Sequence, residues 1–333
     1  MAGRVRVGVI GTSWWAELEH LPGLRSRDDV EVTALCGRDP ARLAEVAGRQ
    51  GVPHTFTDWH ALIRSGRVDA VVIALPNALH HPVAMAALQA GLHVICEKPL
   101  ALDLARAREL AETARAAGRA TLTFFTHRQV GAVAQLKRLV ERGALGQPVH
   151  VSASYFTASH LKPGKAAAWR MMRAESGTGV LGDLGSHLVD LVRWLLGDLT
   201  RVSAHWLTVT PERDGVVTDA DESVSFLAQL ACGAQGVFQA SKLVAGRGNQ
   251  QRLELHGTAA SLLYEAEPGY DPTFEGRLWL GRPDRSALEP VPLDPDSAAA
   301  RRRARGARSR LPAADRSLLP SRPRGWTGLA RLR

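Results

Sequence analysis

Short apolar segments alternate with amphipathic ones through the first 125 residues of this 333-residue chain. The segment Ala70–Leu75 is apolar throughout, as expected for a strand covered by helices on both faces of a parallel sheet. The alternation therefore predicts an α/β fold with a doubly wound parallel sheet over residues 1–125. Its strands are predicted at Val5–Ile10, Val30–Cys36, Ala70–Leu75, His93–Cys96 and Ala120–Phe125.

The pattern changes after residue 125. Helices are predicted at Gln129–Arg142 and Gly185–Leu196, and strand-like segments make up most of the remainder. This composition predicts an α+β domain over residues 126–290 with a large, open, mostly antiparallel sheet. Because the edges of an open sheet need protection, we expect a homo-oligomer, either a dimer or a tetramer. The strands are predicted at Val149–Phe156, Val202–Thr210, Glu222–Leu230, Gln235–Lys242, Arg252–His256, Ser261–Tyr264 and around Trp279.

The net charge of +9 belongs to the end of the chain. Residues 301–333 hold 11 arginines and a single acid, Asp315, whereas the rest of the chain has 31 basic and 32 acidic residues. We expect residues 291–333 to form a solvated, disordered tail, and we do not expect nucleic-acid binding, which would rest on this tail alone. The abrupt change in composition is also consistent with a truncated or frame-shifted end.

Several protein classes are not expected. No apolar run is long enough to span a bilayer, and the N-terminus lacks the pattern of a signal peptide. Cys36, Cys96 and Cys232 are far apart and form no metal-binding spacing. These features predict a cytoplasmic protein with no metal site and no membrane contact.

A glycine turn follows the first predicted strand. The segment from Gly11 to Ala16 fits the dinucleotide-binding pattern G-x-G-x-x-G/A, with Ser13 in place of the second glycine. A phosphate would lie at the N-terminus of the following helix, where free N–H groups favour anions. Cofactor contacts are therefore predicted at Gly11, Thr12, Ser13, Trp14 and Trp15, although the two tryptophans are equally typical of packing.

The end of the second predicted strand bears on the choice of cofactor. Cys36 or Gly37 occupies the position where an acid would bind the ribose of NAD, and Arg38 follows. A guanidinium matches the geometry of a 2′-phosphate, so Gly37 and Arg38 favour NADP(H) over NAD(H). The alternative is that Asp39 reaches the ribose after a small shift in register.

Two further motifs carry acid–base chemistry. Asp183 and His187 are four residues apart in a glycine-rich segment, so a helix would place them on one face, where the acid could orient the imidazole or a substrate hydroxyl. Lys98 follows a buried strand in Glu97-Lys98-Pro99, at the sheet edge where ligands bind in α/β folds. Its charge would favour a developing alkoxide. The simpler readings are a packed histidine and a surface lysine.

Together these motifs resemble the Gfo/Idh/MocA oxidoreductases. The resemblance covers about residues 4–290. It implies a Rossmann domain, a second domain with an open sheet, and hydride transfer between a nicotinamide and a hydroxyl or carbonyl carbon of a sugar or cyclitol. It assigns catalysis to Lys98, Asp183 and His187. Further motif positions would border the nicotinamide or the substrate: Leu75, Pro76, Asn77, His80, Glu97 and Lys98 for the former, and Trp169 and Arg170 for the latter.

The sequence departs from the family pattern at Ser13 and at its end, where no helix that packs back onto the body can be recognised. Two other functions stay open. One is a sensor that binds a dinucleotide without turnover, and the other is a glycosidase that uses tightly held NAD for transient oxidation.

Overall fold

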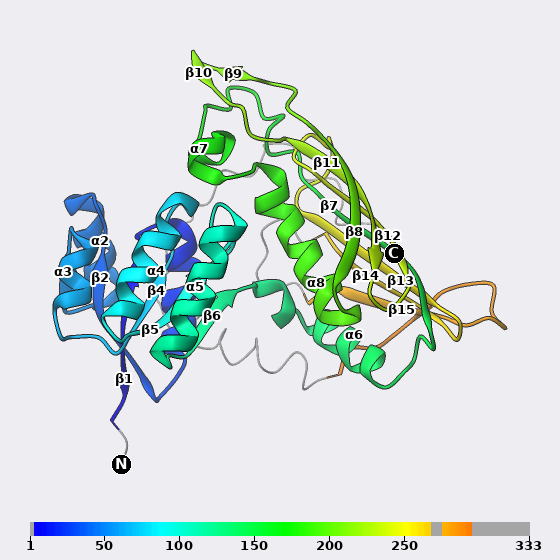
Figure 1. Cartoon of the computed structure of the whole chain (residues 1–333), viewed down its shortest axis with the longest axis horizontal. Coiled ribbons are helices and arrows are strands. Elements are labelled where there is room, and N and C mark those ends of the chain that lie inside the picture. Colours follow the sequence, from blue (N-terminus) through cyan, green and yellow to red (C-terminus); the bar gives the residue numbers. More distant parts are fainter. Residues whose placement is uncertain (1–2, 268–274, 295–333) are drawn as a thin grey trace.

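Two sheets organise the protein, which is described here by a computed structural model covering residues 3–267 and 275–294 (Figure 1). The first sheet is wholly parallel and has the order β3-β2-β1-β4-β5-β6. This is the doubly wound arrangement that the sequence predicts. Its strands are β1 (Val5–Ile10), β2 (Val30–Cys36), β3 (His54–Phe56), β4 (Ala70–Ile73), β5 (His93–Glu97) and β6 (Thr121–Phe124).

Helices cover both faces of this sheet. Local signals fix their ends: Asp39 accepts hydrogen bonds at the start of α2, and Gly51 ends that helix in a left-handed conformation. The sequence pattern does not predict β3 or the short helix α3, because neither is long enough to show a hydrophobic period. The helices are α1 (Leu21–Arg25), α2 (Pro40–Gln50), α3 (Trp59–Arg64), α4 (His80–Gln89) and α5 (Leu104–Ala117).

The second sheet has the order β16-β15-β14-β13-β7-β12-β11-β8. Its strands pair antiparallel except for β7 with β12. The mostly antiparallel open sheet is therefore confirmed. Its strands are β7 (Pro148–Phe156), β8 (Leu199–Leu207), β11 (Ser223–Leu230), β12 (Gln235–Ser241), β13 (Gln250–Gly257), β14 (Ser261–Ala266), β15 (Arg277–Gly281) and β16 (Glu289–Pro290).

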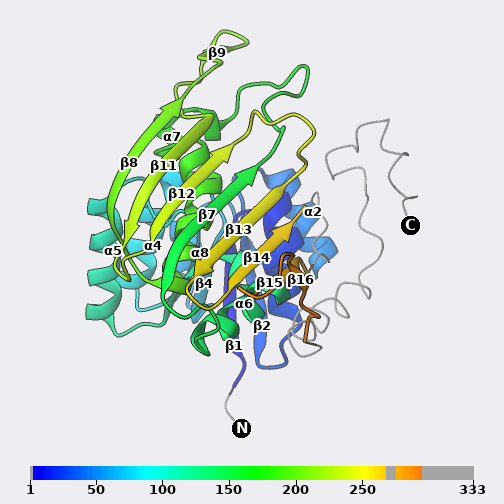
Figure 2. The same cartoon turned by 90° about the vertical axis from the view of Figure 1, so that its right-hand side faces the viewer.

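One face of this sheet is covered and the other is open. The helices α6 (Gly131–Glu141) and α8 (Ser186–Leu196) lie on the face that is turned toward the first domain (Figure 1). Figure 2 shows the strands of the opposite face with no helix in front of them. Accordingly, side chains along β11 alternate between buried and exposed. The short helix α7 (Arg173–Ser176) and the hairpin of β9 (Glu212–Arg213) and β10 (Val216–Val217) lie at one end of this domain.

Ordered contacts continue past the predicted boundary at residue 290. The Val291 N–H donates to the Leu278 carbonyl at 2.7 Å, and both Val291 and Leu293 pack against the core of the second domain. The remainder of the predicted tail, from residue 295 onward, lies outside the described residues. Within the described ranges, no helix combines the length and apolarity needed to cross a membrane.

Candidate active site

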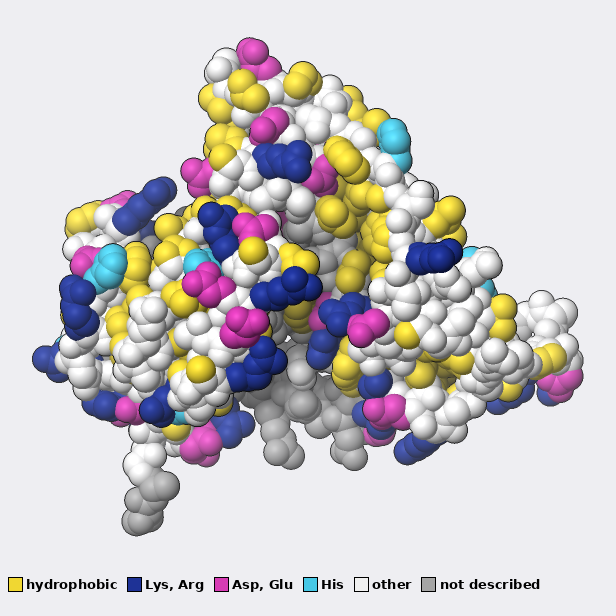
Figure 3. Space-filling view, in the orientation of Figure 1, with side chains coloured by type: hydrophobic (Ala, Val, Ile, Leu, Met, Phe, Trp, Pro, Cys, Tyr) yellow, Lys and Arg dark blue, Asp and Glu magenta, His cyan; other side chains and the backbone are white. Residues whose placement is uncertain are grey.

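The two domains meet where β5 ends and α8 begins. Lys98 directly follows β5, and its Nζ donates to the backbone oxygen of Asp183 at 2.8 Å and to Asp183 Oδ1 at 3.0 Å. A second hydrogen bond also links the two domains: Asn77 Nδ2 of the first domain donates to the Ser176 carbonyl of the second at 3.0 Å. Figure 3 shows the surface hollowed between the two domains. The structure thus brings the predicted lysine and the predicted acid together across the domain boundary.

The Asp183 carboxylate is surrounded by cations. Lys242 Nζ lies 2.7 Å from Oδ2, Lys98 Nζ lies 3.0 Å from Oδ1, and Arg170 Nε lies 3.8 Å from Oδ1. Burial alone would raise the pKa of this carboxyl, but Lys242, Lys98 and Arg170 together hold it well below its usual range. Asp183 is therefore ionised at neutral pH, and its side chain is 24% exposed.

His187 projects from the first turn of α8 into an aromatic pocket. The residue is 6% exposed, and its ring lies 4.1 Å from that of His127, 5.8 Å from Phe125 and 6.1 Å from Tyr155, measured between centroids. Its Nδ1 is buried and has no hydrogen-bond partner. Burial, followed by the charges of His127 and Lys98, lowers the pKa of His187 well below the usual range, so the ring is a neutral proton acceptor.

The expected side-by-side arrangement of Asp183 and His187 is not what the structure shows. Asp183 lies in a π-helical turn, Leu181–Gly185, in which the Ser186 N–H donates to the Leu181 carbonyl five residues earlier. The wider turn changes the angle between positions four apart. The carboxylate consequently faces Lys98 and Lys242, and within the described residues it makes no hydrogen bond to the imidazole. Asp221 stabilises the turn by accepting from the N–H groups of Gly179 at 2.6 Å and Leu181 at 2.7 Å.

The predicted nucleotide turn has no room for a side chain at Gly11 or at the neighbouring Gly37. Gly11 has φ of +129°, and a Cβ there would lie 2.3 Å from the Ala74 carbonyl oxygen. A Cβ at Gly37 would lie 2.6 Å from Thr12 Cγ2, so the ends of β1 and β2 approach closely. Helical structure begins at Trp14, and Ser13 Oγ accepts from the Ala16 N–H at 3.3 Å. Such a turn fits a dinucleotide pyrophosphate, because free N–H groups at a helix start favour anions.

Two of the predicted cofactor contacts, Trp15 and Glu97, are hydrogen-bonded to each other. The buried Glu97 carboxylate accepts from Trp15 Nε1 at 2.6 Å, and the same oxygen lies 2.8 Å from His20 Nε2. Burial would raise the pKa of Glu97, but His20, Trp15 and Lys98 lower it below its usual value. These contacts give Glu97 a role inside the protein, where it joins the helical segment that begins at Trp14 to the end of β5. Its contact with the cofactor stays a prediction.

His80 is likewise internal. It is fully buried, with Nδ1 2.7 Å from the Pro99 carbonyl and Nε2 2.9 Å from the Leu75 carbonyl. Each ring nitrogen lies within hydrogen-bond distance of a carbonyl oxygen, so His80 joins the loop after β4 to the loop after β5. Its contact with the nicotinamide stays a prediction. Leu75 and Pro76 lie half-buried in that first loop, next to the buried Asn77.

The two candidate ribose contacts after β2, Arg38 and Asp39, have different surroundings. Asp39 Oδ1 accepts from the N–H groups of Ala41 at 3.0 Å and Arg42 at 3.2 Å, as the N-cap of α2. Arg38 is exposed, and no other described residue pairs with it. Of the two side chains, Arg38 is the one available to a ligand.

The predicted substrate residues lie beside Asp183. The Arg170 guanidinium stacks 4.2 Å from the centre of the Trp169 ring while its Nε approaches Asp183. Lys242, which directly follows β12 and is 5% exposed, is not among the predicted site residues. A lysine at the end of a predicted strand, Gln235–Lys242, is the one signal that could have singled it out.

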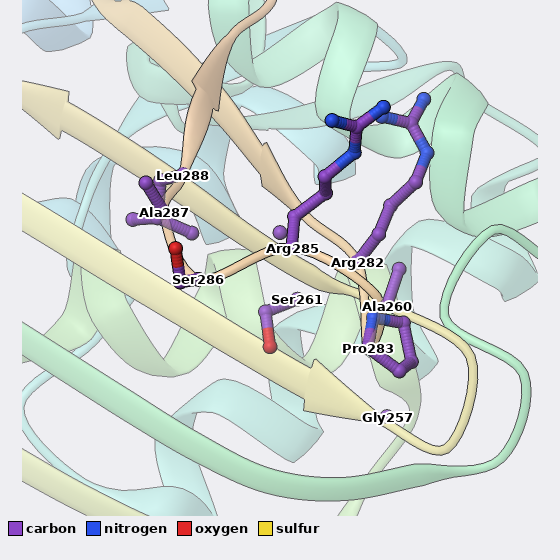
Figure 4. A pocket seen from close by; sticks show the side chains of 10 residues that line it. Gly257, Ala260, Ser261, Arg282, Pro283, Arg285, Ser286, Ala287 and Leu288 are labelled. Atoms are coloured by element: carbon purple, nitrogen blue, oxygen red, sulfur yellow. The ribbon is translucent and has the colours of Figure 1, made fainter.

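A separate hollow lies at the far end of the second sheet. It is lined by Gly257, Ser261, Arg282, Arg285 and Leu288 among others (Figure 4). The Arg282 guanidinium donates to Glu289 at 2.6 Å. It shares no residue with the site around Asp183, and both of its guanidiniums, Arg282 and Arg285, already pair with Glu289, at 2.6 and 3.8 Å.

Comparison with known proteins agrees with this geometry. The model described as "Oxidoreductase family, NAD-binding Rossmann fold" matches residues 5–125, and the "GFO/IDH/MocA C-terminal domain" model matches residues 133–263. The chain is 32% identical over 247 residues to levoglucosan dehydrogenase of Pseudarthrobacter phenanthrenivorans, which covers 69% of this chain and 63% of that protein, less than two thirds of its length.

Other relatives are matched over more of their length. Identity with myo-inositol 2-dehydrogenase of Thermotoga maritima is 31% over 255 residues, covering 76% of this chain and 73% of that protein. A solved structure of levoglucosan dehydrogenase in complex with NADH matches with a TM-score of 0.83 and 27% identity, covering 89% of this chain and 82% of that one. The chain therefore belongs to the Gfo/Idh/MocA family of oxidoreductases with an NAD-binding Rossmann fold.

Proposed function

We propose that this protein transfers hydride between a nicotinamide dinucleotide and a hydroxyl-bearing carbon of a sugar-like or cyclitol substrate. The observation that carries the proposal is the convergence of Lys98, Asp183 and His187 where the two domains meet. The names of two relatives, levoglucosan dehydrogenase and myo-inositol 2-dehydrogenase, indicate substrates of this kind for those proteins. A bound nicotinamide would supply the hydride acceptor or donor.

His187 is the proposed proton carrier. Its neutral ring can accept the proton of a substrate hydroxyl during oxidation, and it can return a proton to the oxygen in the reverse direction. The unpartnered Nδ1 leaves one ring nitrogen without a competing protein partner. The surrounding rings of Phe125, His127 and Tyr155 restrict access of water to it.

Lys98 is the proposed electrostatic contact to the reacting oxygen. Its ammonium would stabilise negative charge that develops on that oxygen, and its two hydrogen bonds to Asp183 keep it in place. Asp183 thus orients the lysine rather than the imidazole. Arg170, stacked on Trp169, is proposed to contact substrate hydroxyls.

Among the two cofactors, we favour NADP(H) over NAD(H). Support comes from the exposed, unpaired Arg38 and from the use of Asp39 as a helix cap. The cofactor in the matched levoglucosan dehydrogenase structure is NADH, so NAD(H) is the competing choice.

Titration of the purified protein with NADPH and with NADH, followed by cofactor fluorescence, tests both points. We expect binding of NADPH to weaken in Arg38→Ala and binding of NADH to change little. Reduction of the oxidised cofactor in the presence of sugars and cyclitols then reports turnover. Tight binding without turnover of any sugar would favour a sensor, and absence of binding would overturn the dehydrogenase proposal.

We also propose a homo-oligomer built on the open sheet. The edge strand β8 exposes Val202, Trp206 and Leu207, and the hairpin of β9 and β10 adds exposed Val216 and Val217. A nine-residue edge strand with exposed apolar side chains is a surface that proteins usually cover. Sedimentation of the purified protein tests this assembly.

A further inference from the structure

In the described part of the chain, no carboxylate is hydrogen-bonded to the imidazole of His187. Its Nδ1 is buried without a partner, and the Asp183 carboxylate pairs with Lys98 and Lys242 instead. The torsion that joins an imidazole to its Cβ has broad minima, so the ring turns easily. A proton carrier must nevertheless lie within hydrogen-bond reach of the oxygen that it serves. Another group must therefore fix the plane of this ring.

The ring of His127 packs directly against that of His187. The two ring centres are 4.1 Å apart and the planes are inclined at 78°, so the edge of one ring meets the face of the other. The rings of Phe125 and Tyr155 lie farther from His187, at 5.8 and 6.1 Å. His127 is therefore the neighbour that most restricts rotation of the imidazole.

A buried amide fixes His127 from its other side. Gln251 Nε2 lies 3.4 Å from His127 Nε2, and Gln251 Oε1 accepts from the Tyr264 hydroxyl at 3.4 Å. Both Gln251 and Tyr264 are buried. Because an amide nitrogen can only donate, His127 Nε2 is the acceptor in this contact. The side chain of His127 is thus attached to the second sheet on one side and contacts His187 on the other.

The backbone segment that carries His127 is also attached to α8. Arg128 Nε and Nη2 donate to the two oxygens of Asp190 at 2.8 and 2.5 Å, and the Asp190 side chain is 9% exposed. Asp190 follows His187 by three residues on α8, so the two lie on one face of the helix. Two consecutive residues, His127 and Arg128, therefore contact neighbouring positions of α8. A substitution at His127 alone leaves the Arg128 pair in place.

We propose that His127 is a positioning residue of the reaction, whose ring fixes the plane of the His187 imidazole in the place of a carboxylate. The proposal rests on the proposed dehydrogenase function and adds a residue that acts through His187 without contacting the substrate. Orientation of this kind matters because small displacements of a reacting group slow a reaction strongly.

The charges around His187 agree with this role. Among the described residues, the titratable side chains that face it are His127, Lys98 after β5, Asp183 in the turn before α8 and Tyr155 of β7. Burial, followed by the charges of His127 and Lys98, lowers the pKa of His187, whereas Asp183 raises it. A proton on His127 thus opposes a proton on His187, and an uncharged ring at position 127 should let His187 take up its proton at higher pH.

Titration of the histidine rings by NMR tests the contact without any substrate. The full chain is labelled at histidine Cε1, and the resonance that is absent from His187→Asn identifies His187. In His127→Phe, the midpoint of this resonance should move to higher pH by about one unit or more. The remaining histidine resonances report whether the fold is kept.

The matched control is His150→Phe. It breaks a second pair of histidine rings, His150 and His256, whose centres are 5.9 Å apart. His150 precedes Tyr155 by five residues on β7, which places it about 16 Å farther along the strand. The His187 midpoint in this variant should equal that of wild type.

Steady-state oxidation of D-glucose, D-galactose and myo-inositol, with NAD⁺ and with NADP⁺, tests the effect on the reaction. At a pH well above the acidic limb, His127→Ala should lower kcat about tenfold or more, because the imidazole is then free to turn. The KM of the cofactor should change little. His127→Phe should restore most of kcat, because it keeps a ring against His187.

The positioning role would be overturned by an unchanged His187 midpoint in His127→Phe, by an equal shift in His150→Phe, by wild-type kcat in His127→Ala, or by a kcat in His127→Phe as low as in His127→Ala. Each of these outcomes leaves the dehydrogenase proposal standing. Absence of both dinucleotide binding and turnover in wild type would overturn the dehydrogenase proposal and the role of His127 in the reaction with it. If wild type binds a dinucleotide but oxidises none of the three probes, the NMR titration alone decides.

Discussion

Lys98 Nζ donates twice to Asp183, once to its backbone oxygen at 2.8 Å and once to Oδ1 at 3.0 Å. The lysine directly follows β5 of the nucleotide-binding sheet, and the aspartate lies in the turn that precedes α8. One side chain thus links the NAD-binding Rossmann domain to the second domain, where we propose that the substrate binds. Each domain alone would present an incomplete set of reactive groups.

Replacement of this lysine tests its role directly. Lys98→Met should lower kcat by about 10²–10³, the loss typical of removing one preorganised electrostatic contact. Binding of the dinucleotide should persist, because the Gly11 turn lies elsewhere on the sheet. Steady-state kinetics and cofactor fluorescence separate the two effects. Unchanged kcat would remove Lys98 from the mechanism.

Lys242 is predicted to act on the reaction through Asp183. Lys242→Met removes the ammonium 2.7 Å from Oδ2, so the pKa of the Asp183 carboxyl should rise. The acidic limb of the profile of kcat/KM against pH should then move to higher pH, and Lys242→Arg should restore it. A loss of activity with an unchanged profile would indicate a purely structural role.

The neutral imidazole of His187 predicts a flat response near neutrality. Because burial lowers its pKa well below the usual value, the oxidative kcat/KM should stay constant above about pH 6.5 and fall only in more acidic solution. His187→Asn should lower kcat by about 10²–10⁴. A limb centred above neutral pH that disappears in this variant would contradict the assignment.

Glu97 is predicted to stabilise the fold and not to react. Glu97→Ala leaves the indole N–H of Trp15 without its acceptor, which should lower the free energy of unfolding by about 1–3 kcal/mol. The pKa of Glu97 is lowered in the folded state, so its ionised form stabilises the protein above the unfolded pKa of about 4.3. That contribution is lost as the pH falls through the folded pKa. Thermal unfolding of wild type and Glu97→Gln should therefore differ most near neutral pH and converge in acid.

Gly11 offers a test of the nucleotide turn with a matched control. In Gly11→Ala, the new Cβ would lie 2.3 Å from the Ala74 carbonyl oxygen at a φ of +129°, so dinucleotide binding and stability should both be lost. Gly23→Ala places a Cβ where no atom lies within 4 Å, and it should bind normally. Wild-type affinity in the first variant would exclude this turn as the nucleotide site.

The sequence predicts the strands of the first domain well, for a physical reason. Val5–Ile10 and Val30–Cys36 are apolar runs bounded by turn residues, and both are found with those bounds. By contrast, β3 pairs through only three residues and leaves no periodic signal.

The site itself is only partly readable from the sequence. Lys98, Asp183 and His187 are found near one another, but their contacts depend on the π-helical turn and on where β12 ends. A turn that is one residue wider has no compositional marker, so the sequence suggests a contact between Asp183 and His187 that the structure does not make. Lys242 becomes visible only once the register of β12 against β7 is known.

The division of the reactive groups between two domains has a consequence for protein engineering. Lys98 donates to the backbone oxygen at position 183 and to the Asp183 carboxylate. A second domain with an aspartate at this position could therefore accept both hydrogen bonds. A hybrid that joins this first domain to the second domain of a relative should therefore retain its choice of dinucleotide while adopting the sugar preference of the donor. Exchange of the second domain would then transfer the proposed substrate range as one unit.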